Sequence, residues 1–100
     1  MSKRIYISGK ISGLPIDKVN QKFKMAERQI FSLGGYPVNP TVMNPSNTKD
    51  WTWNDYMVYD INLLLNCHAI FMLKDWGQSK GARIEYAIAK ELGLEILFQE

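Results

Sequence analysis

The chain has 100 residues, of which 46% are hydrophobic and 22% are charged, and its formal net charge at pH 7 is +2. These values predict a single globular domain, residues 1–100, with one modest hydrophobic core. The small net charge does not favour nucleic acid as a partner, and no apolar run approaches the roughly 20 residues of a membrane span. A start without a signal-peptide pattern and a single cysteine, Cys67, favour a cytoplasmic protein that binds no membrane.

Strand and helix patterns alternate in the first half of the chain. An apolar run rich in β-forming residues predicts a buried strand at 4–8, which ends at Gly9. A loop with glycines and a proline leads to an amphipathic helix at 16–33. Two glycines end this helix, and a short strand at 36–38 and a long polar loop at 39–50 follow. The apolar stripe expected to be buried on the helix consists of Val19, Phe23, Ala26, Ile30 and Leu33.

The second half of the chain continues the alternation. The sequence Thr-Trp-Asn-Asp at 52–55 has the pattern of a capping box in front of a helix that runs to about Asn66. A third strand is predicted at 68–73. A third helix at 79–92, with a glycine as its C-cap, leads to a final apolar strand at 94–98.

This order of elements predicts an α/β fold of three layers, with a parallel sheet of four or five strands and helices on both faces. In such sheets, ligands bind at the carboxyl ends of the strands, near the switch in strand order. Three loops meet at this edge, at 9–15, 39–50 and 74–78, together with the start of the third helix. A ligand crevice is therefore expected there.

Two carboxylates near this crevice have no ordinary helical partner. Glu85 lies one and a half turns into the third helix, and the residues one turn before and after it are small or apolar. Asp60 lies in the middle of the second helix among tyrosine, methionine and leucine neighbours, none of which is basic. Tyr6, central in the first strand, needs a hydrogen-bond partner if it is buried. On pattern alone, structural carboxylates, a solvated helix edge and a core tyrosine bonded to backbone stay open as alternatives.

The fold can bring Tyr6, Asp60 and Glu85 together from the first strand, the second helix and the third helix. Two carboxylates and a phenol suit chemistry at a sugar carbon. One carboxylate attacks the carbon, and the other handles a proton on the leaving group.

Four segments together carry a family resemblance: IYISGKISGLP, NP, WNDYMVYDI and CHAIFMLKDWGQSKGARIEYAIAKELGL. The chain resembles the nucleoside 2-deoxyribosyltransferase-like family over nearly its whole length, and most closely the small DUF4406 branch. The resemblance implies a flavodoxin-like fold and cleavage of an N-glycosidic bond. Members transfer a 2-deoxyribosyl group between bases or hydrolyse 2'-deoxynucleoside 5'-monophosphates. A small nucleotide or nucleoside is thus the expected ligand, a homodimer the expected assembly, and no metal or organic cofactor is expected.

The resemblance also assigns catalytic roles. Glu85 corresponds to the nucleophile and Tyr6 to the tyrosine that orients it. Asp60 corresponds to the aspartate that contacts the sugar or base and assists proton transfer. A hydrogen bond from Tyr6 and the positive end of the third helix both favour an ionised Glu85, although apolar surroundings oppose it.

The expected substrate-binding residues are Gly9, Lys10, Ser79 and Gly81. Ser79 corresponds to the phosphate-binding serine of the nucleotide-hydrolysing members, and it lies where backbone N–H groups of a helix start also favour an anion. Lys10 or Lys80 adds positive charge, and the small residues Gly81 and Ala82 let a sugar approach the helix. Ser79 is equally well explained as a plain N-cap, and the two roles are compatible.

Other features admit simpler explanations. Three tryptophans near the crevice can stack on a base, but we favour packing that closes the loops; they are Trp51, Trp53 and Trp76. One histidine, His68, beside one cysteine makes no zinc site. The alternative function is a non-catalytic nucleotide-sensing or protein-interaction module on the same fold. A phosphoribohydrolase is disfavoured because the Gly-Gly-x-Gly-Thr signature is absent.

Overall fold

The computed structural model describes residues 2–100, and its elements follow the predicted order. Their predicted bounds agree within one residue at each end, and a short 3-10 helix, η1, forms in the predicted loop at 74–78. The elements are β1 (Arg4–Ser8), α1 (Ile16–Ser32), β2 (Tyr36–Val38), α2 (Trp53–Leu65), β3 (Ala69–Met72), η1 (Trp76–Gln78), α3 (Lys80–Leu92) and β4 (Glu95–Phe98).

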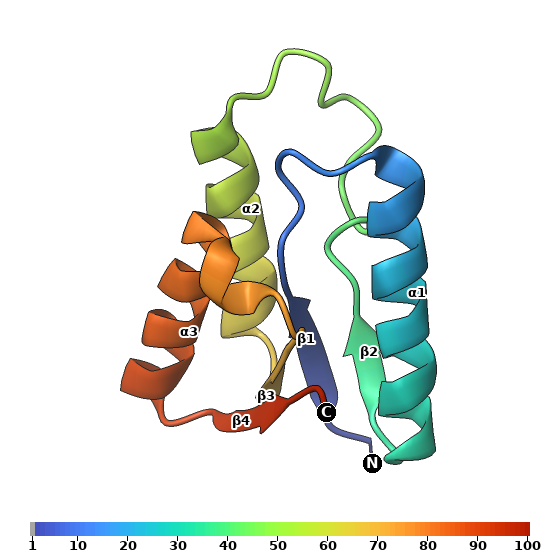
Figure 1. Cartoon of the computed structure of the whole chain (residues 1–100). Helices are drawn as coiled ribbons and strands as arrows, with labels where there is room; N and C mark the ends of the chain where they lie inside the picture. The colour runs from blue at the N-terminus through green and yellow to red at the C-terminus, as the bar shows by residue number, and fades with distance from the viewer. Residues whose placement is uncertain (1) are drawn as a thin grey trace.

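The four strands form one parallel sheet in the order β2-β1-β3-β4. Helix α1 covers one face, and α2 and α3 cover the other (Figure 1). This arrangement confirms the predicted three-layer, flavodoxin-like α/β fold and sets the number of strands at four.

Side chains of β1 alternate between the two layers, as strand geometry requires. Ile5 and Ile7 pack in the core on the α1 side, whereas Tyr6 packs in the core on the side of α2 and α3. Both faces of the sheet are covered, which explains why the strands read as nearly continuous apolar runs. The predicted stripe of α1 is buried except for Leu33, for which the prediction is wrong. Leu33 is the C-cap residue and is 65% exposed, because the chain leaves the helix there toward the glycine turn.

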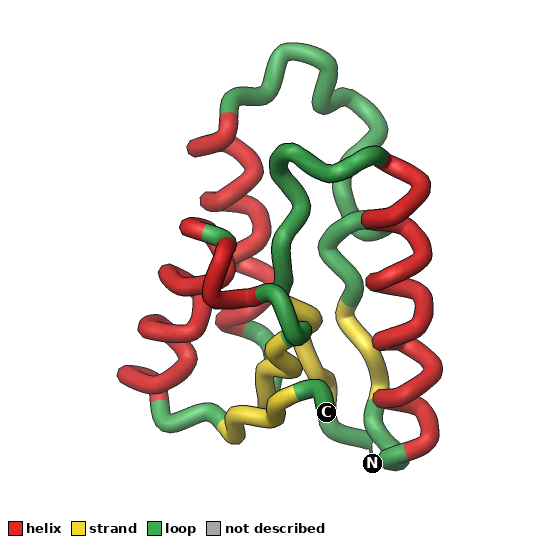
Figure 2. The backbone as a smooth tube through the Cα atoms, viewed as in Figure 1, coloured by secondary structure: helices red, strands yellow, loops and turns green. Residues whose placement is uncertain are grey.

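The strand order creates a crevice at one end of the sheet. The chain leaves β1 for a helix on one face and leaves β3 for a helix on the other face, so the connections diverge at the carboxyl ends of these two neighbouring strands. The loops 9–15 and 39–52 both extend from this end of the sheet (Figure 2). The chain enters β1 at the opposite end of the sheet, whereas the C-terminal residues follow the carboxyl end of β4, where the backbone N–H of Gln99 donates to the carbonyl oxygen of Met72 at 2.9 Å.

Gly9 is held where β1 ends by contact with the neighbouring connection. A Cβ atom at this position would lie 2.6 to 2.9 Å from side-chain atoms of Leu73, including its Cβ. Because a Cβ atom moves only with its backbone, this crowding has no easy relief. The absence of a side chain at Gly9 is therefore a packing requirement of the sheet edge.

We predict that Gly9→Ala lowers the free energy of unfolding by about 1–3 kcal/mol through overpacking. Gly77→Ala is the matched control, because no atom lies within 4 Å of the Cβ it would add. Chemical denaturation of both variants measures the difference. Equal stability of the two would contradict the packing role of Gly9.

Candidate active site

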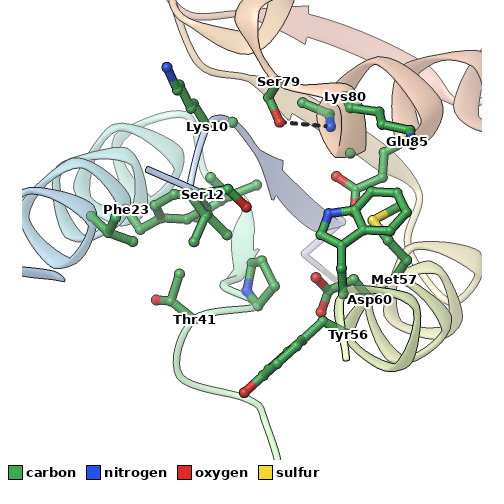
Figure 3. Close-up of a pocket in the computed structure, with 18 of the residues that line it drawn as sticks. Lys10, Ser12, Phe23, Thr41, Tyr56, Met57, Asp60, Ser79, Lys80 and Glu85 are labelled. Carbon is green, nitrogen blue, oxygen red and sulfur yellow. Dashed lines mark hydrogen bonds between the residues drawn. The ribbon is translucent and has the colours of Figure 1, made fainter. Parts of the chain in front are cut away.

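A pocket of about 630 Å³ occupies the crevice at the carboxyl ends of β1 and β3 (Figure 3). Its walls come from β1 and the loop after it, α1, the loop after β2, α2 and the start of α3. All of the residues predicted as catalytic or substrate-binding line it; they are Tyr6, Gly9, Lys10, Asp60, Ser79, Gly81 and Glu85. The structure thus brings them to one place, while their roles in catalysis and binding stay predictions.

Glu85 is held by two hydroxyl groups from the central strand. Its side chain is only 5% exposed. The Tyr6 hydroxyl donates a hydrogen bond to Oε2 at 2.8 Å, and the Ser8 hydroxyl donates one to Oε1 at 2.6 Å. The partner that Glu85 lacks on its own helix is therefore supplied by the sheet, and both carboxylate oxygens are engaged.

Ser8 is the residue that sequence reasoning missed. A signal for it existed, because residues two apart in a strand point to the same face and Ser8 follows Tyr6 by two. A polar residue on a face covered by helices needs a partner as much as a buried tyrosine does.

Asp60 has the opposite environment. It is 9% exposed, and its Oδ1 is buried without a hydrogen-bond partner among residues 2–100. The other such atom in these residues is Oδ1 of Asn44, which lines the same pocket. Buried polar atoms are nearly always paired in proteins, so two unpaired ones in residues that line one pocket make it a candidate site for a polar ligand.

Burial shifts the titration of these groups. Desolvation raises the pKa of Glu85 to about 7, although the hydrogen bonds from Ser8 and Tyr6 act to lower it. Desolvation also raises the pKa of Asp60 to about 7, and the nearby charge of Glu85 adds to this rise. Burial, together with the Glu85 charge, holds the pKa of Tyr6 well above its usual range, so the phenol stays a donor.

The two carboxyl groups are a coupled pair in different surroundings. Figure 3 shows Glu85 and Asp60 on the same side of the pocket, carried by α3 and α2. Hydrogen bonds stabilise the ionised form of Glu85, and nothing comparable stabilises an ionised Asp60. When the pair holds one proton, that proton therefore resides mainly on Asp60.

At the start of α3, Ser79 has the geometry of an N-cap. Its Oγ accepts a hydrogen bond from the backbone N–H of Ala82 at 3.1 Å (Figure 3). The side chain of Lys80 lies over Trp53, with Nζ 4.9 Å from a ring centroid. Lys10 lines the pocket, but its side chain points away from the two carboxyl groups (Figure 3). The predicted phosphate contacts thus lie at the rim and the carboxyl groups lie deeper.

An ion pair fixes the loop after β1. Lys22 Nζ donates to the backbone oxygen of Lys10 at 2.6 Å and to Oδ2 of Asp75 at 2.5 Å. The backbone N–H of Lys10 donates to the other carboxylate oxygen of Asp75 at 3.1 Å. These contacts join α1 to the connections after β1 and β3, so they hold one wall of the pocket. No local sequence pattern indicated them.

The space beside Gly81 is taken up by packing. A Cβ atom there would lie 3.1 Å from Sδ of Met57. Gly81 therefore lets α3 approach α2, and because it also lines the pocket, its part in binding a sugar stays a prediction.

Two tryptophans pack against neighbouring aromatic rings. Trp51 packs against Tyr56 and Trp76 against Tyr86, with ring centroids 5.1 and 4.7 Å apart. Of the three tryptophans, Trp53 alone lines the pocket.

Cys67 and His68 have local partners away from the pocket. The Cys67 thiol donates to the carbonyl oxygen of Leu63 at 3.3 Å, and burial raises the pKa of this thiol to about 11. His68 Nδ1 accepts a hydrogen bond from the backbone N–H of Arg4 at 2.9 Å. Within residues 2–100, no three His, Cys, Asp or Glu side chains are arranged to hold a metal ion. Across the same residues, no helix has the length and apolar character needed to span a membrane.

Residues 3–98 match the family model described as a domain of unknown function, DUF4406. The chain belongs to the DUF4406 family. The predicted resemblance to this branch is thereby confirmed, whereas the wider link to nucleoside deoxyribosyltransferases stays an expectation. A comparison with curated proteins found no match. The chemistry of the pocket therefore has to be argued from its own residues.

The raised carboxyl pKa values predict that stability falls with rising pH. A carboxyl group whose pKa is about 7 in the folded protein and about 4 in the unfolded chain contributes stability that is complete below pH ~4 and lost as the pH rises to ~7. We expect Asp60→Asn to remove part of this loss. At pH 8 the variant should be more stable than the native protein by about 1–2 kcal/mol, or roughly 5–15 °C in melting temperature.

At pH 5, where Asp60 is already protonated, the two proteins should melt at similar temperatures. Asp50→Asn, a change at an exposed loop carboxylate, is the control and should leave the pH dependence unaltered. Thermal melts across this pH range provide the test. A lower melting temperature for Asp60→Asn at pH 8 would contradict the prediction.

Proposed function

We propose that this DUF4406 protein cleaves or transfers at the N-glycosidic bond of a deoxynucleotide or nucleoside through a covalent glycosyl intermediate on Glu85. The observation that carries the proposal is the pair of buried carboxyl groups in one pocket. Glu85 accepts two hydroxyl hydrogen bonds, and Asp60 has an oxygen without a partner. One ionised and one protonated carboxyl group are what such a reaction requires.

The environments suggest which group attacks. Tyr6 and Ser8 favour the Glu85 anion, which suits a nucleophile. Asp60 retains a proton near neutral pH because it is desolvated and lies near the Glu85 charge. It therefore suits the general acid that protonates the departing base.

In the proposed first step, a Glu85 oxygen bonds to the anomeric carbon and the carbon–nitrogen bond breaks. The electron pair of that bond goes to the base nitrogen, and Asp60 supplies a proton, so the base leaves neutral. In the second step, Asp60 as carboxylate takes a proton from water or from an incoming base. That acceptor bonds to the anomeric carbon and releases Glu85 as a carboxylate.

The remainder of the pocket supports a ligand of this class. Its volume of about 630 Å³ falls within the range of small-molecule sites. Trp53 and Tyr56 line the pocket and offer aromatic surface for a base. At the rim, the N-terminal end of α3 and the ammonium groups of Lys10 and Lys80 favour an anion such as a 5'-phosphate.

We predict that Glu85→Gln abolishes base release by several orders of magnitude, because the nucleophilic anion is lost. Native and variant proteins would be incubated with deoxynucleosides and their 5'-monophosphates, and free base measured by chromatography. Acid-quenched native protein should carry a sugar adduct on the peptide that contains Glu85, detectable by mass spectrometry.

Glu91→Gln changes an exposed glutamate of the same helix and is the control for charge and folding. A folded Glu85→Gln protein that releases base at the native rate would end the nucleophile hypothesis. Nucleotide binding without base release by the native protein would instead support the non-catalytic module.

A second prediction concerns the rim. Ser79→Asp and Ser79→Asn both keep a good N-cap residue, so the two variants should differ in stability by less than about 1 kcal/mol. The carboxylate of Ser79→Asp should repel a phosphate and replace a contact worth about 1.5–3 kcal/mol. We therefore expect monophosphates to bind Ser79→Asp at least about tenfold more weakly than Ser79→Asn, whereas nucleoside affinity changes little. Calorimetric titrations compare them, and equal monophosphate affinities would remove the phosphate role from this position.

A further inference from the structure

Ser8 lies at a rigid and fully buried position beside Glu85. It is the last residue of β1, is 1% exposed, and pairs with Met72 of β3 across the sheet. Its carbonyl oxygen accepts a hydrogen bond from the backbone N–H of Leu73 at 2.8 Å. The Ser8 hydroxyl therefore points at the Glu85 carboxylate from a backbone that the neighbouring strand holds in place.

We propose that Ser8 is a positioning residue, which together with Tyr6 keeps Glu85 ionised and fixes the plane of its carboxylate. The geometry points to it because the two hydroxyls bind different oxygens of Glu85, Ser8 at Oε1 and Tyr6 at Oε2. With both oxygens held, the carboxylate cannot rotate without breaking a buried hydrogen bond.

No cation takes over this role in residues 2–100. The ion pairs in this part of the chain are Lys3 with Glu95 and Lys22 with Asp75, and neither involves Glu85. The groups that face Glu85 from the elements packed against it are the two hydroxyls of β1 and the carboxyl group of Asp60 on α2. Lys10 and Lys80 line the same pocket but neither donates a hydrogen bond to Glu85. The anion thus depends on neutral donors, of which Ser8 makes the shorter bond.

Neutral hydrogen-bond donors suit a carboxylate that attacks the anomeric carbon in the first step and is the leaving group in the second. A cation paired with Glu85 would hold the anion tightly and oppose attack. Hydroxyl donors stabilise the carboxylate more moderately, and they do so again when the bond between the anomeric carbon and Glu85 breaks and its electron pair returns to the carboxylate. This second part of the inference rests on the proposed function; the control of Glu85 ionisation does not.

The test is a titration of Glu85 itself. The side-chain carboxyl carbon of Glu85, in protein labelled with ¹³C and assigned by its absence in Glu85→Gln, is followed by NMR against pH. Loss of a hydrogen bond to a charged group should raise the apparent pKa of Glu85 by about one pH unit in Ser8→Ala. Tyr6→Phe should shift it in the same direction. Ser32→Ala, the same change on the exposed face of α1, should leave it unaltered.

Ser8→Cys separates the hydrogen bond from the volume of the side chain. A thiol fills the site but is a weak donor, so the pKa of Glu85 should rise by an amount between native protein and Ser8→Ala. A Glu85 titration that is unchanged in Ser8→Ala, with the variant melting as a folded protein, overturns the inference. If Ser8→Ala does not fold, an unchanged titration in Ser8→Cys overturns it in the same way.

Activity measurements then distinguish this inference from the proposed function. If the protein is active, the acid limb of the pH–rate profile for base release should shift to higher pH in Ser8→Ala, by the same number of pH units as the NMR titration of Glu85. A shifted titration in a native protein that releases no base from any substrate would keep the role of Ser8 and reject the glycosidic reaction. Base release in Ser8→Ala with no shift in either the acid limb or the NMR titration would keep the glycosidic reaction and reject the role of Ser8.

Discussion

The pair of hydrogen bonds from β1 to Glu85 is the interaction on which the pocket depends. Each bond to an ionised carboxylate contributes about 1.5–3 kcal/mol, yet burial still raises the pKa of Glu85 to about 7. Desolvation therefore outweighs two good hydrogen bonds, and the site is destabilising near neutral pH. The total stability of a domain is only of order 5–15 kcal/mol, so a destabilising buried carboxylate is better explained by a function than by a packing role. An apolar side chain at Glu85 would fill the same layer without the penalty.

The topology explains why this carboxylate meets a cavity instead of more core. β1 is central, and its carboxyl end borders the point where the connections diverge to opposite faces. Tyr6 and Ser8 lie on the strand face that α3 covers, so they reach Glu85 just below that divergence. The ion pair of Lys22 with Asp75 holds together the loops that follow β1 and β3 at this end of the sheet. The strand order thus places the polar residues of β1 beside the open end of the sheet.

Much of the fold could be read from the sequence because its signals are local. Alternating strand and helix patterns, the capping box at 52–55 and the Ser79 cap all depend on residues within a few positions of each other. The contacts that build the site are not local. Ser8 and Glu85 are 77 positions apart, and Lys22 and Asp75 are 53 apart, so no periodicity reports them.

The order of elements predicts that Tyr6 and Glu85 converge, the family resemblance predicts that they form a hydrogen bond, and the structure shows this bond. Leu33 shows the limit of such patterns, since a regular apolar stripe does not reveal at which residue a helix ends. The homodimer and the wider family link stay predictions.

The coupling between the two carboxyl groups also limits what the pocket accepts. A 5'-phosphate at the rim adds negative charge near Glu85 and Asp60, and like charge raises carboxyl pKa values further. That change helps Asp60 keep its proton but works against an ionised Glu85. The hydroxyls of Tyr6 and Ser8 bind only Glu85, so they favour one of the two groups, whereas Lys10 and Lys80 at the rim offset the phosphate charge for both. If Glu85 acts as the proposed nucleophile, an anionic substrate would be compatible with it, because cations line the rim and neutral donors hold the carboxylate at the base of the pocket.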